Sequence, residues 1–171
     1  MNVNFATISD SQPGVIAALL RASYAELLRS DSRWENEEDK FEEYDREVFA
    51  YPDTVGACVF LTRIGGKLAG FGSWDPRRKP EYAIIGHNCV LPEFRGRGLG
   101  KEQIREVLRR FQKLPAGAAR VSTCNHPFFV PAQRMYLACG FSERRRLPAS
   151  NSPNGVELIE YEKAPPVCIV S

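Results

Sequence analysis

The sequence has little that would direct it into a membrane or out of the cell. No apolar run approaches the roughly 20 residues that a membrane-spanning helix needs, and the longest one in a helical pattern covers only residues 15–20. Segment 1–10 has no basic start followed by an apolar stretch, so we expect no signal peptide. We therefore expect no membrane partner and a cytoplasmic location.

Net charge and metal-ligating patterns are also scarce. The formal net charge of +2 is too small to indicate a nucleic-acid partner. The cysteines are odd in number and no pair has CxxC spacing, since they stand at positions 58, 89, 124, 139 and 168. We therefore expect no metal, and reduced, buried thiols rather than disulfides or zinc ligands.

The chain does have a globular composition and a regular succession of elements. Its 171 residues, 43% hydrophobic and 26% charged, suit one domain over 1–171. The first helix has apolar positions from 15 to 28, and Ser9 or Asp10 is its candidate N-cap. The full predicted order is strand 3–8, that helix, helix 34–51, strands 55–64, 67–74 and 82–91, a helix from near Gly98, strand 119–124, helix 130–141, and strands 143–147 and 156–163. This order predicts a mixed α/β fold, and the tail 164–171 is ambiguous.

A glycine-rich stretch, FRGRGLGKEQI at 94–104, follows the apolar strand 82–91 and leads into an amphipathic helix. The first N–H groups of a helix have no internal partner, and the helix dipole favours negative charge there. Glycines let an anion approach the backbone, and Arg95, Arg97 and Lys101 add donors. The stretch predicts a phosphate site, and more specifically a site for a pyrophosphate.

Two common phosphate motifs do not fit this stretch. A P-loop needs Ser or Thr after its lysine and a glycine six positions before that lysine, whereas this chain has Glu102 and Arg95. The Rossmann pattern needs a third glycine where Lys101 stands, and it belongs in the first βα unit of a domain.

A third pattern does fit, and it carries a resemblance. The sequence Val90-Leu91-Pro92 followed by RGRGLG at 95–100 resembles the acetyl-CoA motif of the GNAT superfamily of N-acetyltransferases. A second motif, AQRMYLACGF at 132–141, resembles a later helix of the same family. The alternative, a plain glycine turn with solvated arginines, does not explain two ordered motifs. The resemblance covers about 3–163, without the tail 164–171. It implies a central mixed sheet of about seven strands with about four helices, splayed between strands 82–91 and 119–124.

The resemblance also implies a co-substrate and its binding residues. Acetyl-CoA would place its pantetheine between the two splayed strands, against backbone at Cys89 and Val90. Its diphosphate would lie on Arg95, Gly96, Arg97, Gly98, Leu99, Gly100 and Lys101. A backbone N–H near Cys89 or Val90 would stabilise the oxyanion, and Asn125 would contact the cofactor.

Tyr136 matches the family's usual general acid, which protonates the departing CoA thiolate. The alternative for this residue is a core aromatic. The base is open between His126, which we prefer slightly, His87, Glu81 and a water relay. A covalent route through Cys89 is disfavoured, because no histidine stands at an obvious hydrogen-bonding spacing from it.

The sequence gives less information on the acetyl acceptor than on acetyl-CoA, the acetyl donor. Segment 35–47 holds eight acidic and two basic residues, which would suit either a cationic amine or a solvated helix face. The expected function is acetyl transfer to a primary amine of a small molecule. The alternatives are a protein or peptide acetyltransferase and a non-catalytic acetyl-CoA-binding module. Homodimerisation is common in such proteins and is left open.

Overall fold

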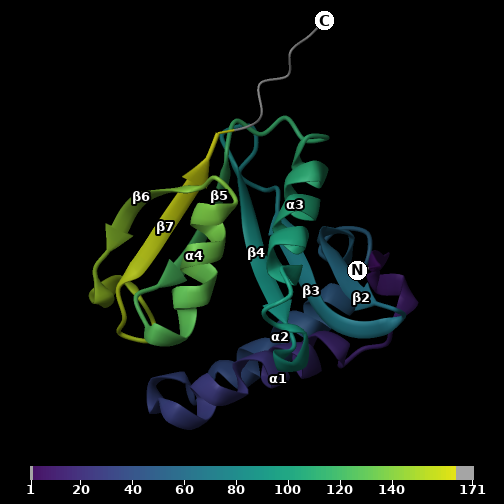
Figure 1. The fold of residues 1–171 in the computed structure, drawn as a ribbon, viewed down its shortest axis with the longest axis horizontal. Coiled ribbons are helices and arrows are strands. Elements are labelled where there is room, and N and C mark those ends of the chain that lie inside the picture. Colours follow the sequence, from purple (N-terminus) through teal and green to yellow (C-terminus); the bar gives the residue numbers. More distant parts are fainter. Residues whose placement is uncertain (1, 165–171) are drawn as a thin grey trace, which may run out of the picture. The chain divides into compact units, whose positions relative to one another are not determined.

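The computed structural model describes residues 2–164, and in this range the predicted order of elements is confirmed (Figure 1). Residues 165–171 of the tail, which include Cys168, lie outside the described residues. The helices are α1 (Val15–Ser30), α2 (Glu37–Ala50), α3 (Leu99–Phe111) and α4 (Val130–Ala138). The strands are β1 (Val3–Thr7), β2 (Val59–Ile64), β3 (Lys67–Asp75), β4 (Ala83–Val90), β5 (Ala119–Cys124), β6 (Ser142–Leu147) and β7 (Leu158–Lys163).

The strands form one mixed sheet in the order β1-β2-β3-β4-β5-β7-β6. β1 with β2, β2 with β3, β5 with β7 and β6 with β7 are antiparallel, whereas β4 and β5 are parallel. The expected seven-stranded mixed sheet with four helices is therefore confirmed. The register of β4 with β5 pairs Ala83 with Ala119 and Ile84 with Arg120, at the start of both strands. The splay expected further along these strands stays a prediction.

Contacts divide the chain into two compact units. The N-terminal unit comprises the residues up to Ser73 together with His87–Gln103, and the C-terminal unit comprises Trp74–Gly86 together with the residues from Ile104 on. Each unit is described by itself below. The interpretation of 1–171 as a single domain stays a prediction.

The core of the N-terminal unit lies between its two helices and the strands β2, β3 and β4. Helix α1 buries Ile16, Leu19 and Leu20 in a cluster with Val48 of α2 and with buried residues of these strands. Their spacing of three and four residues along α1 places them on one helix face. The apolar pattern at 15–28 therefore predicted the packed face correctly.

The N-cap expected for α1 was wrong. Ser9 and Asp10 both lie in the short 3₁₀ helix Ile8–Asp10, and α1 begins only at Val15, after Gly14. The N-terminus is capped instead by the buried carboxylate of Asp45 from α2, which accepts bonds from Gly14 N–H at 2.7 Å, Ile16 N–H at 2.8 Å and Ala17 N–H at 3.2 Å. A distant carboxylate satisfies the orphan donors that a local cap would have taken.

In the C-terminal unit, α4 contacts β7 through the Tyr136 and Tyr161 rings and β5 through a bond from Gln133 Nε2 to Cys124 O. Strand β7 lies between β5 and β6 in the sheet (Figure 1). The edge strand β6 is exposed, and its three arginines form ion pairs with glutamates of β6, of β7 and of the segment before β7: Arg144 with Glu160, Arg145 with Glu160, and Arg146 with Glu143 and Glu157. Charged side chains on an edge strand discourage pairing with other chains. The basic run at 144–146 is therefore neutralised within the hairpin.

Candidate functional site

The glycine-rich loop sits between the end of β4 and the start of α3. Gly96 and Gly98 have φ values of +74° and +79°, and a Cβ on either would meet nothing within 4 Å. Glycine at these two positions therefore allows the left-handed backbone conformation and leaves open space beside the loop. Gly100 lies in the first turn of α3 with an ordinary helical φ.

The start of α3 presents unpaired backbone donors. Lys101 N–H and Glu102 N–H both donate to Gly98 O, at 3.0 and 3.2 Å. Within residues 2–164, the N–H groups of Leu99 and Gly100 have no acceptor. An anion is the ligand that such a helix N-terminus favours.

The basic residues of the loop divide into two kinds. Arg97 and Lys101 are exposed, and the Arg97 guanidinium stands 5.8 Å from the Phe94 ring centroid. Arg95 is exposed as well, but it also donates through Nε to Val90 O at 3.0 Å and through Nη2 to Ser23 O at 2.7 Å. It thereby ties the loop to β4 and α1, a role that the sequence did not reveal because Ser23 is 72 residues away. Its contact with a diphosphate stays a prediction.

The backbone of β4 presents alternate residues to its two edges. Leu91 N–H donates to Ala69 O at 2.9 Å, and His87 N–H donates to Ser73 Oγ at 2.8 Å, so both face β3. Cys89, two residues from each, faces the same way, whereas Val90 N–H points to the other edge of β4. Of the two candidates for the oxyanion donor, Val90 is therefore the one whose N–H is directed away from β3.

Both the thiol and the carbonyl of Cys89 make hydrogen bonds. Its thiol is buried and lies 2.7 Å from Ser23 Oγ and 3.3 Å from Leu19 O, while its carbonyl accepts a bond from Gln103 Nε2 at 3.1 Å. Burial raises the pKa of the thiol to about 12, so it stays protonated at neutral pH. A protonated thiol is a poor nucleophile, which agrees with direct transfer.

His87 packs among aromatic rings in the N-terminal unit. Its ring centroid lies 5.0 Å from that of Tyr44 and 6.0 Å from that of Phe71. Burial lowers the pKa of His87 from 6.5 to about 4, and the nearby charge of Glu37 opposes that shift. The imidazole is therefore neutral at pH 7 but only a weak base.

Half of the eight acidic residues in segment 35–47 have partners within the N-terminal unit. Glu37 pairs with Lys40, Glu38 and Glu42 pair with Arg21, and Asp45 caps α1. These contacts favour a structural role of this helix face over a role in binding a cationic amine.

Tyr136 lies in the C-terminal unit, on α4. It is buried, and its ring centroid is 6.1 Å from that of Phe141 and 5.8 Å from that of Tyr161. Burial raises the pKa of Tyr136 above its ordinary value of 10.0. The ring is thus a packed aromatic, and the hydroxyl remains protonated and able to donate.

The other two candidates of this unit stand after β5. His126 Nδ1 accepts the N–H of Phe128 at 3.1 Å and so caps the short turn Pro127–Phe129. Asn125 N–H donates to Glu157 O at 2.8 Å, and its side-chain amide lies 3.5 Å from Glu157 Oε1. Because His126 Nδ1 already accepts the Phe128 N–H, the geometry favours a structural role, and the role of His126 as a base stays a prediction.

The expected site residues thus form two groups. The N-terminal unit contains Cys89, Val90 and the loop 95–101, and the C-terminal unit contains Asn125, His126 and Tyr136. Among residues 2–164, no group of three or more side chains is arranged to hold a metal ion. No helix in that range has the length and apolar character to cross a membrane.

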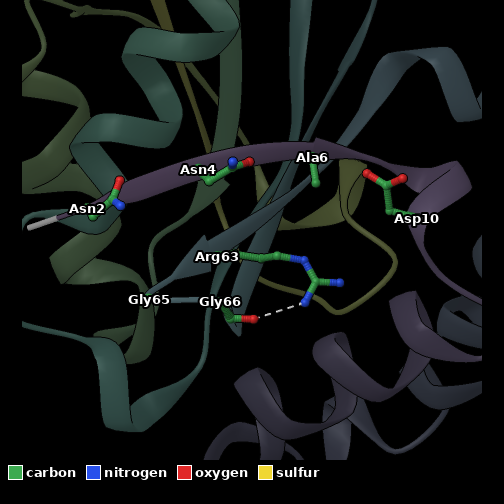
Figure 2. A pocket seen from close by; sticks show the side chains of 7 residues that line it. All are labelled: Asn2, Asn4, Ala6, Asp10, Arg63, Gly65 and Gly66. Atoms are coloured by element: carbon green, nitrogen blue, oxygen red, sulfur yellow. Dashed lines mark hydrogen bonds between the residues drawn. The ribbon is translucent and has the colours of Figure 1, made fainter.

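A separate hollow of about 440 Å³ lies in the N-terminal unit, beside β1 and the β2–β3 turn (Figure 2). Arg63 reaches into it and donates to Gly66 O at 3.2 Å. The lining mixes polar and apolar surface and comprises Asn2, Asn4, Ala6, Asp10, Arg63, Gly65 and Gly66. It shares no residue with the loop 95–101.

Comparison with known proteins defines the class of this fold. Residues 21–141 match the family model described as the acetyltransferase (GNAT) family. The chain therefore belongs to the GNAT family of acetyltransferases, as the two sequence motifs predicted.

Individual relatives agree with this assignment. A mycothiol acetyltransferase from Thermobispora bispora is 30% identical over 123 residues, which cover 66% of this chain and 38% of that protein. The chain thus spans less than half of that relative. A GNAT-family structure from Desulfovibrio desulfuricans has a TM-score of 0.73 at 21% identity, covering 96% of this chain and all of that one. The Salmonella typhimurium protein yncA, solved with its cofactor acetyl-CoA, has a TM-score of 0.65 at 16% identity, covering 97% of this chain and 94% of that one. These two structures establish the fold.

Proposed function

We propose that this chain transfers the acetyl group of acetyl-CoA to a primary amine of a small molecule, by direct attack. The observation that carries the proposal is the loop 95–101, where two left-handed glycines and the open N–H groups of Leu99 and Gly100 follow β4. A diphosphate has the charge and acceptors for this site. The acetyl-CoA held by the neighbour yncA supports the same ligand.

Each proposed residue has one task in the reaction. Arg97, Lys101 and the first turn of α3 bind the diphosphate. Val90 N–H donates to the thioester oxygen as the amine nitrogen attacks the carbonyl carbon and negative charge develops there. When the carbon–sulfur bond breaks, the Tyr136 hydroxyl gives its proton to the departing thiolate. The amine loses its own proton to water, since His87 is a weak base and His126 Nδ1 is occupied.

A small-molecule acceptor is supported by the name of one relative, mycothiol acetyltransferase. The acidic segment 35–47 gives little separate support, because half of its acidic residues already have partners in the chain, namely Glu37, Glu38, Glu42 and Asp45.

Calorimetry with acetyl-CoA, followed by a thiol-release assay, tests the proposal. The acceptor panel holds small primary amines, amino sugars and short peptides with free N-termini. Acetyl-CoA binding with turnover on small amines is the expected result. Turnover confined to peptides would show that the acceptor is a peptide and not a small molecule. Binding of acetyl-CoA without turnover on any acceptor or on water would indicate a non-catalytic module. Absence of acetyl-CoA binding would overturn the proposal.

A further inference from the structure

Gln103, in the second turn of α3, is a polar side chain in a fully buried position. Its exposed fraction is 0%. Its amide nitrogen donates to Thr62 Oγ1 at 2.9 Å and to Cys89 O at 3.1 Å, while its amide oxygen is buried with no partner in the described part of the chain. Because Cys89 O can only accept, the amide orientation is fixed. A buried amide with an unpaired oxygen is less stabilising than an apolar side chain of similar shape.

The contact with Cys89 depends on a β-bulge in β3. Thr62 of β2 pairs with Gly70, whereas Arg63 pairs with Leu68, so Ala69 is an extra residue in β3. A Cβ on Gly70 would stand 2.0 Å from Cys89 O and 3.1 Å from Gln103 Nε2. The bulge disrupts the ladder here, and the absence of a side chain at Gly70 lets the carbonyl and the Gln103 amide meet.

The bonded carbonyl belongs to the same peptide group as Val90 N–H. The Cys89–Val90 bond is trans, so its C=O and N–H lie in one plane and point in opposite directions. Cys89 O is directed toward Gln103, and Val90 N–H is directed to the other edge of β4. A donor on the carbonyl therefore fixes the direction of the N–H and polarises it.

We propose that Gln103 is a positioning residue, which orients and polarises the Cys89–Val90 peptide so that Val90 N–H stabilises the oxyanion of acetyl transfer. This inference rests on the proposed function and adds a residue that neither sequence motif indicated. Gln103 lies on the helix whose first turn follows the glycine loop. One side chain thus links the helix of the diphosphate site to the peptide that faces the thioester.

Two matched variants test the role. Gln103→Met keeps the length and removes both donors, whereas Thr62→Val removes only the other acceptor and leaves the bond to Cys89 in place. The assay is release of free thiol from acetyl-CoA in water, where a water oxygen bonds to the carbonyl carbon, the carbon–sulfur bond breaks, and acetate, a proton and CoA thiol form.

We expect Gln103→Met to lower kcat by about 10- to 100-fold, which is at most the effect of removing a whole oxyanion donor. The acetyl-CoA KM should change by less than about twofold. Thr62→Val should lower the melting temperature yet keep kcat within about twofold. An unchanged kcat for Gln103→Met, or an equal loss in Thr62→Val, would overturn the proposal.

Two further measurements keep the test decisive. If Gln103→Met does not fold, Gln103→Glu replaces it: its buried carboxyl donates to Cys89 O only when protonated, so its kcat relative to wild type should rise as pH falls. A ratio of the two kcat values that does not change with pH contradicts the proposal. The Val90 amide resonance should shift in the Gln103 variant and not in Thr62→Val. That signal needs no turnover, so it separates this inference from the proposed function, which fails instead if wild type does not bind acetyl-CoA.

Discussion

The carboxylate of Asp45 accepts the backbone N–H of Ile16 at 2.8 Å, across 29 residues of sequence. The bond joins the middle of α2 to the first turn of α1. The carboxylate is 3% exposed and takes two further N–H bonds, from Gly14 and Ala17. It therefore fixes how the two helices of the N-terminal unit pack on each other.

Asp45→Asn should destabilise the protein, because an amide accepts fewer of these bonds and lacks the charge that the helix N-terminus favours. We expect the free energy of unfolding to fall by about 1–3 kcal/mol, measured by urea denaturation. Asp10→Asn is the matched control, since Asp10 is exposed and does not cap α1. Equal effects of the two substitutions would contradict the cap.

Gly98→Asp should abolish tight acetyl-CoA binding. A carboxylate beside the diphosphate site repels the ligand, and we expect affinity to fall more than about tenfold by calorimetry. Gly155→Asp is the control, because Gly155 also has a positive φ, +63°, with nothing within 4 Å of its Cβ position. Both changes strain the backbone by about 1 kcal/mol. If the two variants bind acetyl-CoA alike, the loop does not hold the diphosphate.

Tyr136→Phe should lower kcat by about tenfold, the modest end of general acid catalysis, with little change in the acetyl-CoA KM. Tyr161→Phe is the control, since Tyr161 is a buried neighbour 5.8 Å away between ring centroids. Until an acceptor is known, acetyl-CoA hydrolysis is the assay. A lower melting temperature with normal kcat would show that Tyr136 is only a core aromatic.

The same hydroxyl gives a pH prediction. Burial raises the pKa of Tyr136 above 10.0, so the acid form persists as pH rises. Wild-type kcat should show no fall between about pH 7 and about pH 9 from loss of this proton. A descending limb in that range that disappears in Tyr136→Phe would contradict the raised pKa.

His126→Asn separates the cap from the base. The asparagine side-chain oxygen can accept the Phe128 N–H that Nδ1 accepts at 3.1 Å, so the turn after β5 should persist. We expect kcat to stay within about threefold of wild type, against the 10²–10⁴-fold that a lost general base costs. A loss in that larger range, with an unchanged melting temperature, would establish His126 as the base.

His87 should make the fold less stable in mild acid. Its folded pKa is lowered to about 4 from 6.5, so the unfolded chain binds the proton more readily, and the stability that neutral His87 contributes is lost as pH falls from 6.5 toward 4. His87→Asn lacks this titration. The melting-temperature difference between wild type and His87→Asn should shrink as pH falls, and a constant difference would exclude this role.

Local pattern was enough to predict much of this protein. The spacing of apolar residues predicted the order of elements, because helix and strand periodicities depend on neighbours within a few positions. Gly96 and Gly98 marked the anion loop for the same reason: a left-handed φ is a local demand that selects glycine. The motifs 95–100 and 132–141 predicted the family, and the match over 21–141 confirmed it.

Only the tertiary structure decided the contacts between distant residues. Asp45 rather than Asp10 caps α1, Arg95 donates to Ser23 O, and Gln103 bonds to Cys89 O through the gap left at Gly70. No pattern along the chain encodes these pairs, because each depends on packing that brings separate elements within hydrogen-bond distance. The sequence by itself therefore determined the class of fold and the anion loop, whereas packing decided which polar groups are buried, which are paired, and which backbone N–H of β4 is directed away from β3.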